Sequence, residues 1–156
     1  MDFRDLFHAA ARASADLERC NRQIAAMWEK VSSPNGMSYD TIRTRNGSTT
    51  DPTNAIDSMI EKEMRIRRGR ARECEAVLDA AWDAVGIVSA DLSDASAQVL
   101  SEHYLFGHTW QEVAASIARR SRTTPKDMAD AALDWLDSFC EVYEDDEGPH
   151  VRIRKA

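Results

Sequence analysis

The stretch most informative about the fold is residues 99–114, which read VLSEHYLFGHTWQEVA. Apolar side chains recur at helical spacing up to Gly107, and a glycine just beyond such a pattern is a common helix end. Thr109 then begins a new helix, because a threonine followed three residues later by Glu112 forms a capping box. The stretch predicts two helices separated by a tight turn.

The flanking residues extend this pattern to three short helices, at about 91–106, 109–119 and 124–139. Ser121 and the run Thr123-Thr124-Pro125 supply the break and the start before the third helix. Apolar positions in all three segments would close one small core: Leu100, Tyr104, Leu105, Trp110, Val113, Ala114, Ile117, Met128, Leu133 and Leu136. Three short helices with a tight second turn predict a helix-turn-helix unit.

Two longer helices are predicted before this unit, at about 2–31 and 52–85, each with an apolar seam at alternating spacings of three and four residues. The first seam is Phe3, Leu6, Ala10, Ala13, Leu17, Cys20, Ile24, Met27 and Val31. The second is Ile56, Ile60, Met64, Arg67, Ala71, Cys74, Leu78, Ala81 and Val85. Residues 32–50, rich in Ser, Thr, Asn and Gly, are predicted to be a polar loop, and the run 86–89 is predicted to end the second helix.

Two seams in one chain favour an antiparallel helical hairpin, since neither helix can bury its apolar stripe alone. Pairing of each seam with another subunit remains an alternative, as does a homodimer built on the hairpin. The predicted fold is therefore all-α. It comprises a hairpin at 1–88, a helix-turn-helix domain at 89–140 and an acidic, then basic, tail at 141–156. We expect the four tryptophans, at positions 28, 82, 110 and 135, to anchor helix packing.

Composition narrows the class of protein. A chain of 156 residues, 43% hydrophobic, can form one domain or one small domain with a helical extension. The net charge of −7 argues against a generally basic, nucleic-acid-coating protein. No apolar run approaches the roughly 18 residues of a membrane span, and the start MDFRDLF is unlike a signal peptide. Three cysteines without paired spacing fit a chain whose thiols are reduced. We therefore expect a cytoplasmic protein that does not associate with a membrane.

The sequence shows no pattern typical of an enzyme, a cofactor site or a metal site. His103 and His108 are five residues apart, whereas two ligands on one helical face need a spacing of three or four. There is no glycine-rich phosphate loop and no nucleophile elbow. We expect no enzymatic activity, no cofactor and no metal.

The run 99–114, followed by Ser121 and by Ala132-Leu133-Asp134-Trp135-Leu136, resembles the region-4 helix-turn-helix of sigma factors. It is more similar to phage-encoded, sigma-like regulators of the ArpU and RinA type. The motif covers about 45 residues, and the two long helices separated by a polar loop ending in Asp-Pro extend the likeness over most of the chain. The resemblance implies a DNA-binding transcriptional regulator of a phage or prophage, with promoter or operator DNA and host RNA polymerase as candidate partners.

The resemblance places the DNA-contacting residues around the turn and the start of the third helix. Phosphates would be held by Arg119, Arg120 and Arg122, and bases would be read by Thr123, Thr124, Lys126 and Asp127. The start of a helix also attracts phosphate through its unpaired N–H groups. The structural alternative is that Arg119 and Arg120 cap the end of the preceding helix and face water.

The third helix departs from the family pattern, because Asp127 and Asp130 stand where a basic residue is usual. Residues 91–139 hold eight acidic and four basic residues, a net charge of −4. An alternative function is therefore a non-enzymatic protein-interaction module, a degenerate acidic helix-turn-helix that mimics DNA or inhibits a host or phage protein. Salt-sensitive DNA binding would favour the regulator, and a basic protein partner would favour the module.

A second basic cluster lies at 62–72, where Lys62, Arg65, Arg67, Arg68, Arg70 and Arg72 are opposed by Glu63 alone. Arg65, Arg68 and Arg72 are candidates for contact with phosphate or with a partner. The interpretation we favour is structural: these side chains are solvated or pair with acids of the first helix such as Asp16, Glu18 and Glu29, as is usual for charged runs on long helices.

Overall fold

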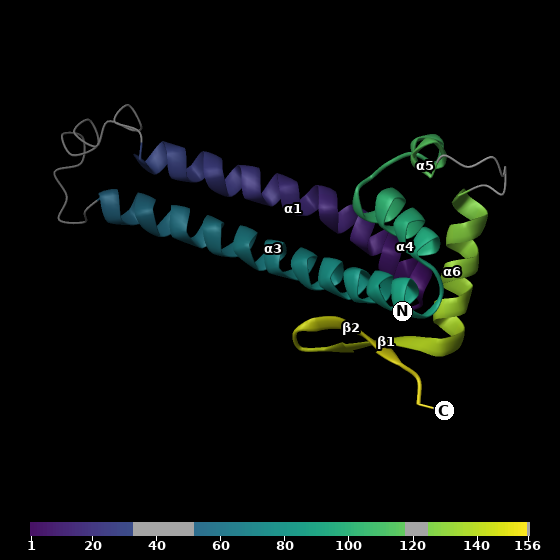
Figure 1. Ribbon diagram of the computed structural model, residues 1–156. Coiled ribbons are helices and arrows are strands. Elements are labelled where there is room, and N and C mark those ends of the chain that lie inside the picture. Colours follow the sequence, from purple (N-terminus) through teal and green to yellow (C-terminus); the bar gives the residue numbers. More distant parts are fainter. Residues whose placement is uncertain (33–51, 118–124, 156) are drawn as a thin grey trace. The chain divides into compact units, whose positions relative to one another are not determined.

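The computed structural model describes residues 1–32, 52–117 and 125–155 of the chain. Figure 1 shows the order of elements: α1 (Phe3–Ser32), α3 (Pro52–Asp91), α4 (Asp94–Leu100), the π-helical turn η1 (Ser101–Leu105), α5 (Trp110–Ser116), α6 (Pro125–Phe139), β1 (Cys140–Asp145) and β2 (Gly148–Ile153). The protein is mostly helical with one two-stranded antiparallel sheet, so the all-α prediction is correct except for this sheet.

The chain divides into two compact units. Unit 1 combines Met1–Asp16 with Glu73–Ala156, and unit 2 is Leu17–Arg72. Each long helix contributes to both units. The expected functional division, with a boundary after residue 88, stays a prediction.

The predicted seam of α1 is its buried face. Phe3, Leu6, Ala10 and Ala13 are buried in unit 1, and Cys20 is buried in unit 2. Within unit 2, Met64 and Ala71 of α3 are also buried, and Arg67 Nε donates a hydrogen bond to Gln23 Oε1 of α1 at 3.1 Å. The three-and-four spacing thus identified the faces that these helices bury.

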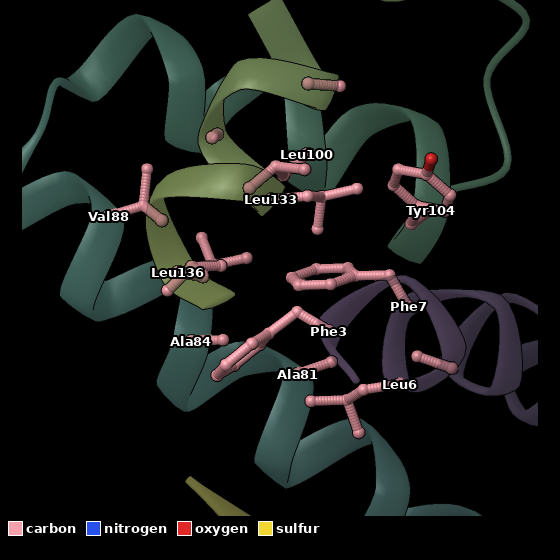
Figure 2. Packing of buried hydrophobic residues seen from close by; sticks show 14 of the residues in the cluster. Phe3, Leu6, Phe7, Ala81, Ala84, Val88, Leu100, Tyr104, Leu133 and Leu136 are labelled. Atoms are coloured by element: carbon pink, nitrogen blue, oxygen red, sulfur yellow. The ribbon is translucent and has the colours of Figure 1, made fainter. Parts of the chain in front are cut away.

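The core of unit 1 brings together residues from both ends of the sequence. Figure 2 shows Phe3, Leu6 and Phe7 of α1 lying among Ala81 and Ala84 of α3, Tyr104 of η1, and Leu133 and Leu136 of α6. The rings of Phe7 and Tyr104 pack with their centroids 5.5 Å apart. Burial of such side chains contributes about 1.5–3 kcal/mol each, so α1 is an integral part of the core around α6.

Two predicted boundaries were wrong. The helix α3 continues to Asp91 and passes through the run 86–89, because Val88 is fully buried in the core and its packing outweighs the local glycine and serine signals. The predicted helix 91–106 begins only at Asp94, where Ser93 caps it through a hydrogen bond from Ser96 N. It then changes to the π-helical turn η1.

The predicted tail at 141–156 instead contains a β-hairpin that follows α6 directly. Val142 pairs with Val151, and both side chains pack against the core, while Cys140 is buried. At the turn, Gly148 adopts φ +123°, which other residues rarely adopt. The high proportion of acidic residues at 141–147 obscured this hairpin in the sequence.

The prediction for the tryptophans holds for only part of the set. Trp110 and Trp135 are half-buried and pack against unit 1's core. Trp28 and Trp82 are instead 50% and 43% exposed, so the anchoring role expected of them was wrong. Trp82 makes an edge-to-face contact with the exposed ring of Phe106, at 5.7 Å between centroids.

Candidate nucleic-acid interface

The turn before α5 is built by the residues that the sequence marked. Gly107 adopts φ +74°, and the Thr109 hydroxyl accepts a hydrogen bond from Glu112 N at 3.2 Å. The ring of His103 stacks on Trp110 at 3.6 Å between centroids, and the His103 Nδ1 lies 2.8 Å from the His108 carbonyl oxygen. Because the carbonyl can only accept, Nδ1 carries the proton in this contact. These contacts fix the amino end of α5 against η1.

A carboxylate joins the other end of α5 to the preceding helical turn. Glu102 Oε1 accepts hydrogen bonds from Ser116 Oγ at 2.7 Å and from Gln98 Nε2 at 3.0 Å. The hydrogen bond from Gln98 and then that from Ser116 lower the pKa of Glu102 below its usual 4.5. The second oxygen, Oε2, is buried and has no hydrogen-bond partner among the described residues. Sequence reasoning missed this cluster, for which the spacing of 14 residues between Glu102 and Ser116 gives no signal.

One face of helix α6 is buried, and two residues of its first turn on the opposite face are exposed. Pro125, Ala129, Leu133 and Leu136 are among its buried residues. Lys126 and Asp127, both predicted to read DNA bases, are exposed in the first turn. The other residues predicted for this interface lie outside the described residues: Arg119, Arg120, Arg122, Thr123 and Thr124.

The aspartates further along α6 contact α1 within unit 1. Arg4 donates to Asp134 Oδ1 at 2.9 Å and lies 3.8 Å from Asp130 and 3.9 Å from Asp137. Phe3 N, at the start of α1, donates to Asp137 Oδ1 at 3.1 Å. The hydrogen bond to Asp134 raises the pKa of Arg4 from its usual value. Asp130, which stands where the family pattern usually has a basic residue, therefore has a cation beside its carboxylate.

The basic cluster on α3 is mostly exposed. Arg67 pairs with Glu63 of the same helix at 2.5 Å. Arg65, Arg68 and Arg72 are exposed, and within the described ranges none of them has an ion pair. Their exposure agrees with the solvated form of the structural interpretation, whereas pairing of these three with acids of α1 is not seen in the part of the chain that the structure describes.

Charge is distributed unequally between the two units. Unit 2, residues 17–72, holds eleven basic and seven acidic residues, a net charge of +4. Unit 1 holds nine basic and twenty acidic residues, a net charge of −11. A polyanion can therefore contact unit 1 only at a local group of basic side chains, because the net charge of that unit repels it. The net charge of unit 2 attracts a polyanion.

Comparison of the chain with protein-family models, with curated proteins and with solved structures finds no match. In the described ranges, no group of three or more His, Cys, Asp and Glu side chains is arranged to hold a metal ion. None of the helices described has the length and apolar character needed to cross a bilayer.

Proposed function

We propose that the protein is a phage-type, sigma-region-4-like DNA-binding regulator of transcription. In this proposal α4 with η1, α5 and α6 form the helix-turn-helix unit, and α1 and α3 pair as an antiparallel hairpin. In sequence just before α6, Arg119, Arg120 and Arg122 hold phosphates. Bases are read by Thr123 and Thr124, also before α6, and by Lys126 and Asp127 in its first turn. The protein would act in the cytoplasm on promoter or operator DNA, alone or with host RNA polymerase.

The observation that carries this proposal is the contact between Arg4 and the aspartates of α6. In the sequence, Asp130 stands where a basic residue is usual, and Asp134 adds to the net charge of −4 over residues 91–139. With Arg4 close to both, their field is partly neutralised, so the exposed first turn can approach phosphate at a lower electrostatic cost. The shared core of α4, η1, α5 and α6, with the capped start of α5, supports the same arrangement.

The test is fluorescence anisotropy of a labelled mixed-sequence duplex at increasing salt. We expect binding that weakens with salt, and a double variant Arg119→Ala/Arg122→Ala whose slope of log affinity against log salt is smaller by about 2. The matched control, Arg12→Ala/Lys155→Ala, removes the same charge from exposed positions of unit 1. Equal slopes for the wild type and the Arg119/Arg122 variant would show that these arginines do not contact DNA phosphates.

The protein-interaction module remains a second candidate because of the charge of −11 on unit 1 and the exposure of Asp127. One observation counts against it, because three of the four aspartates of α6, Asp130, Asp134 and Asp137, lie within 4.0 Å of Arg4. A folded protein that binds no duplex at low salt, but binds a basic protein partner, would favour the module.

A further inference from the structure

We propose that the exposed face of α3 between Lys62 and Arg72 binds the phosphate backbone of duplex DNA, separately from the contacts around α6. This α3 basic face consists of Lys62, Arg65, Arg68 and Arg72, with Gly69 among them. The inference rests on the proposed function, because it adds a second contact with the same ligand. It places that contact in unit 2, the unit whose net charge is positive.

The first argument is that these cations lack ion-pair partners among the residues that the structure describes. Lys62, Arg65, Arg68 and Arg72 are exposed, and none has an ion pair in the part of the chain that the structure describes. Arg68 is three residues from Arg65 and four from Arg72, and like charges at these spacings destabilise a helix. A bound polyanion would relieve this repulsion, and no carboxylate in the described ranges forms an ion pair that does so.

The second argument is the glycine within this face. A glycine inside a helix destabilises that helix relative to alanine. A Cβ added to Gly69 would meet no atom within 4 Å, so among the described residues no packing contact requires the glycine. Its missing side chain instead leaves the helix backbone open between Arg65, Arg68 and Arg72, where a phosphate chain can approach closely.

The third argument concerns the form of nucleic acid. Single-stranded sites combine basic side chains with aromatic rings on which bases stack, and residues 58–72 contain no aromatic residue. From Lys62 to Arg72 the face extends roughly 15 Å along the helix axis, at 1.5 Å per residue. One strand of a duplex presents a phosphate about every 3.4 Å of its own axis, so several phosphates lie within reach. Backbone contact with a duplex fits these features.

The test compares three charge-removal variants by anisotropy of a labelled mixed-sequence duplex over a range of salt concentrations. For Arg65→Ala/Arg68→Ala/Arg72→Ala we expect the slope of log affinity against log salt to fall by about 3. The control Arg12→Ala/Arg22→Ala/Lys30→Ala removes the same charge from exposed positions of α1 and should change the slope much less. Equal slopes for the two triple variants, or no change in the first, would overturn the inference.

The double variant Arg119→Ala/Arg122→Ala separates this inference from the proposed function. If the α3 triple variant loses slope and the double variant does not, the α3 face binds DNA and the predicted contact near α6 fails. The reverse result overturns the α3 face alone, and a wild-type protein that binds no duplex at low salt overturns both. Equal affinity for a single strand of the same length, or for anionic lipid vesicles, would overturn the assignment to duplex DNA.

Gly69→Ala tests the open backbone without changing charge. Alanine should raise the thermal unfolding temperature, because it favours the helix, and should weaken duplex binding severalfold, because the methyl group occupies the space of the approaching phosphate chain. Ser58→Ala, also exposed on α3, is the control and should leave the affinity unchanged. Full affinity in a stabilised Gly69→Ala protein would show that the glycine has no role in binding.

Discussion

The guanidinium of Arg4 lies 2.9 Å from the carboxylate of Asp134, so the first turn of α1 is bound to α6. Asp130 and Asp137 lie within 4.0 Å of the same guanidinium. One cation at the start of the chain thus accompanies three carboxylates on the helix that we propose approaches DNA. This relationship determines how strongly that helix repels a phosphate backbone.

Replacing Arg4 with alanine tests this masking. We expect the free energy of unfolding to fall by only about 0.5–1 kcal/mol, because the partners are partly exposed and screened by solvent. The affinity for duplex DNA at low salt should also fall, since the uncovered carboxylates repel phosphates. Urea denaturation and anisotropy measure the two effects.

Arg12→Ala is the control, because Arg12 is exposed on the same helix and has no ion pair within the described ranges. If masking is correct, Arg4→Ala weakens DNA binding more than Arg12→Ala does. Adding Asp134→Asn to Arg4→Ala should then restore part of the affinity. Equal losses in the two single variants would show that only net charge matters.

The capping contact at Thr109 gives a prediction for α5. Thr109→Ala removes the acceptor for Glu112 N, and loss of such a cap costs about 1 kcal/mol. Thr109→Ser keeps a hydroxyl at the same position and should retain most of the stability. Urea unfolding of the three proteins measures the difference, and an alanine variant as stable as the serine variant would show that the cap contributes nothing.

Local signals in the sequence were the ones that predicted structure correctly. Gly107, Thr109 and Glu112 act on neighbours within a few residues, and the seam from Phe3 to Cys20 follows from helix periodicity. These features define the helices and the faces that they bury without reference to the rest of the fold.

Features that depend on contacts between residues far apart in the sequence could not be predicted from local patterns. Arg4 and Asp134 are 130 residues apart, so no spacing rule connects them. The extension of α3 past Gly86 depends on burial of Val88 in a core that other segments complete. The β-hairpin depends likewise on a surface against which Val142 and Val151 can pack.

Glu102 predicts a dependence of stability on pH. Its pKa is lowered in the folded protein by hydrogen bonds from Gln98 and Ser116, so these contacts stabilise the fold fully above the usual pKa of 4.5. The contribution is lost as the pH falls through the lower, folded-state pKa. Glu102→Gln removes the ionisable group, so the difference in stability between wild type and variant should shrink on acidification. Urea midpoints between pH 7 and pH 3 measure this, and a constant difference would contradict the assignment.

Two glycines of unit 1 predict opposite effects of the same substitution. Gly148 has φ +123°, and a Cβ there would lie 3.0 Å from the Ala76 Cβ, so Gly148→Ala should destabilise the protein by roughly 1–2 kcal/mol. Gly86 lies within α3, where a Cβ would meet nothing within 4 Å, so Gly86→Ala should stabilise it by about 0.5–1 kcal/mol. Thermal and urea unfolding of the two variants decide the matter. A Gly148→Ala protein as stable as wild type would mean that the β-hairpin turn does not pack against α3 as described, since both the backbone angle and the contact with Ala76 oppose a side chain there.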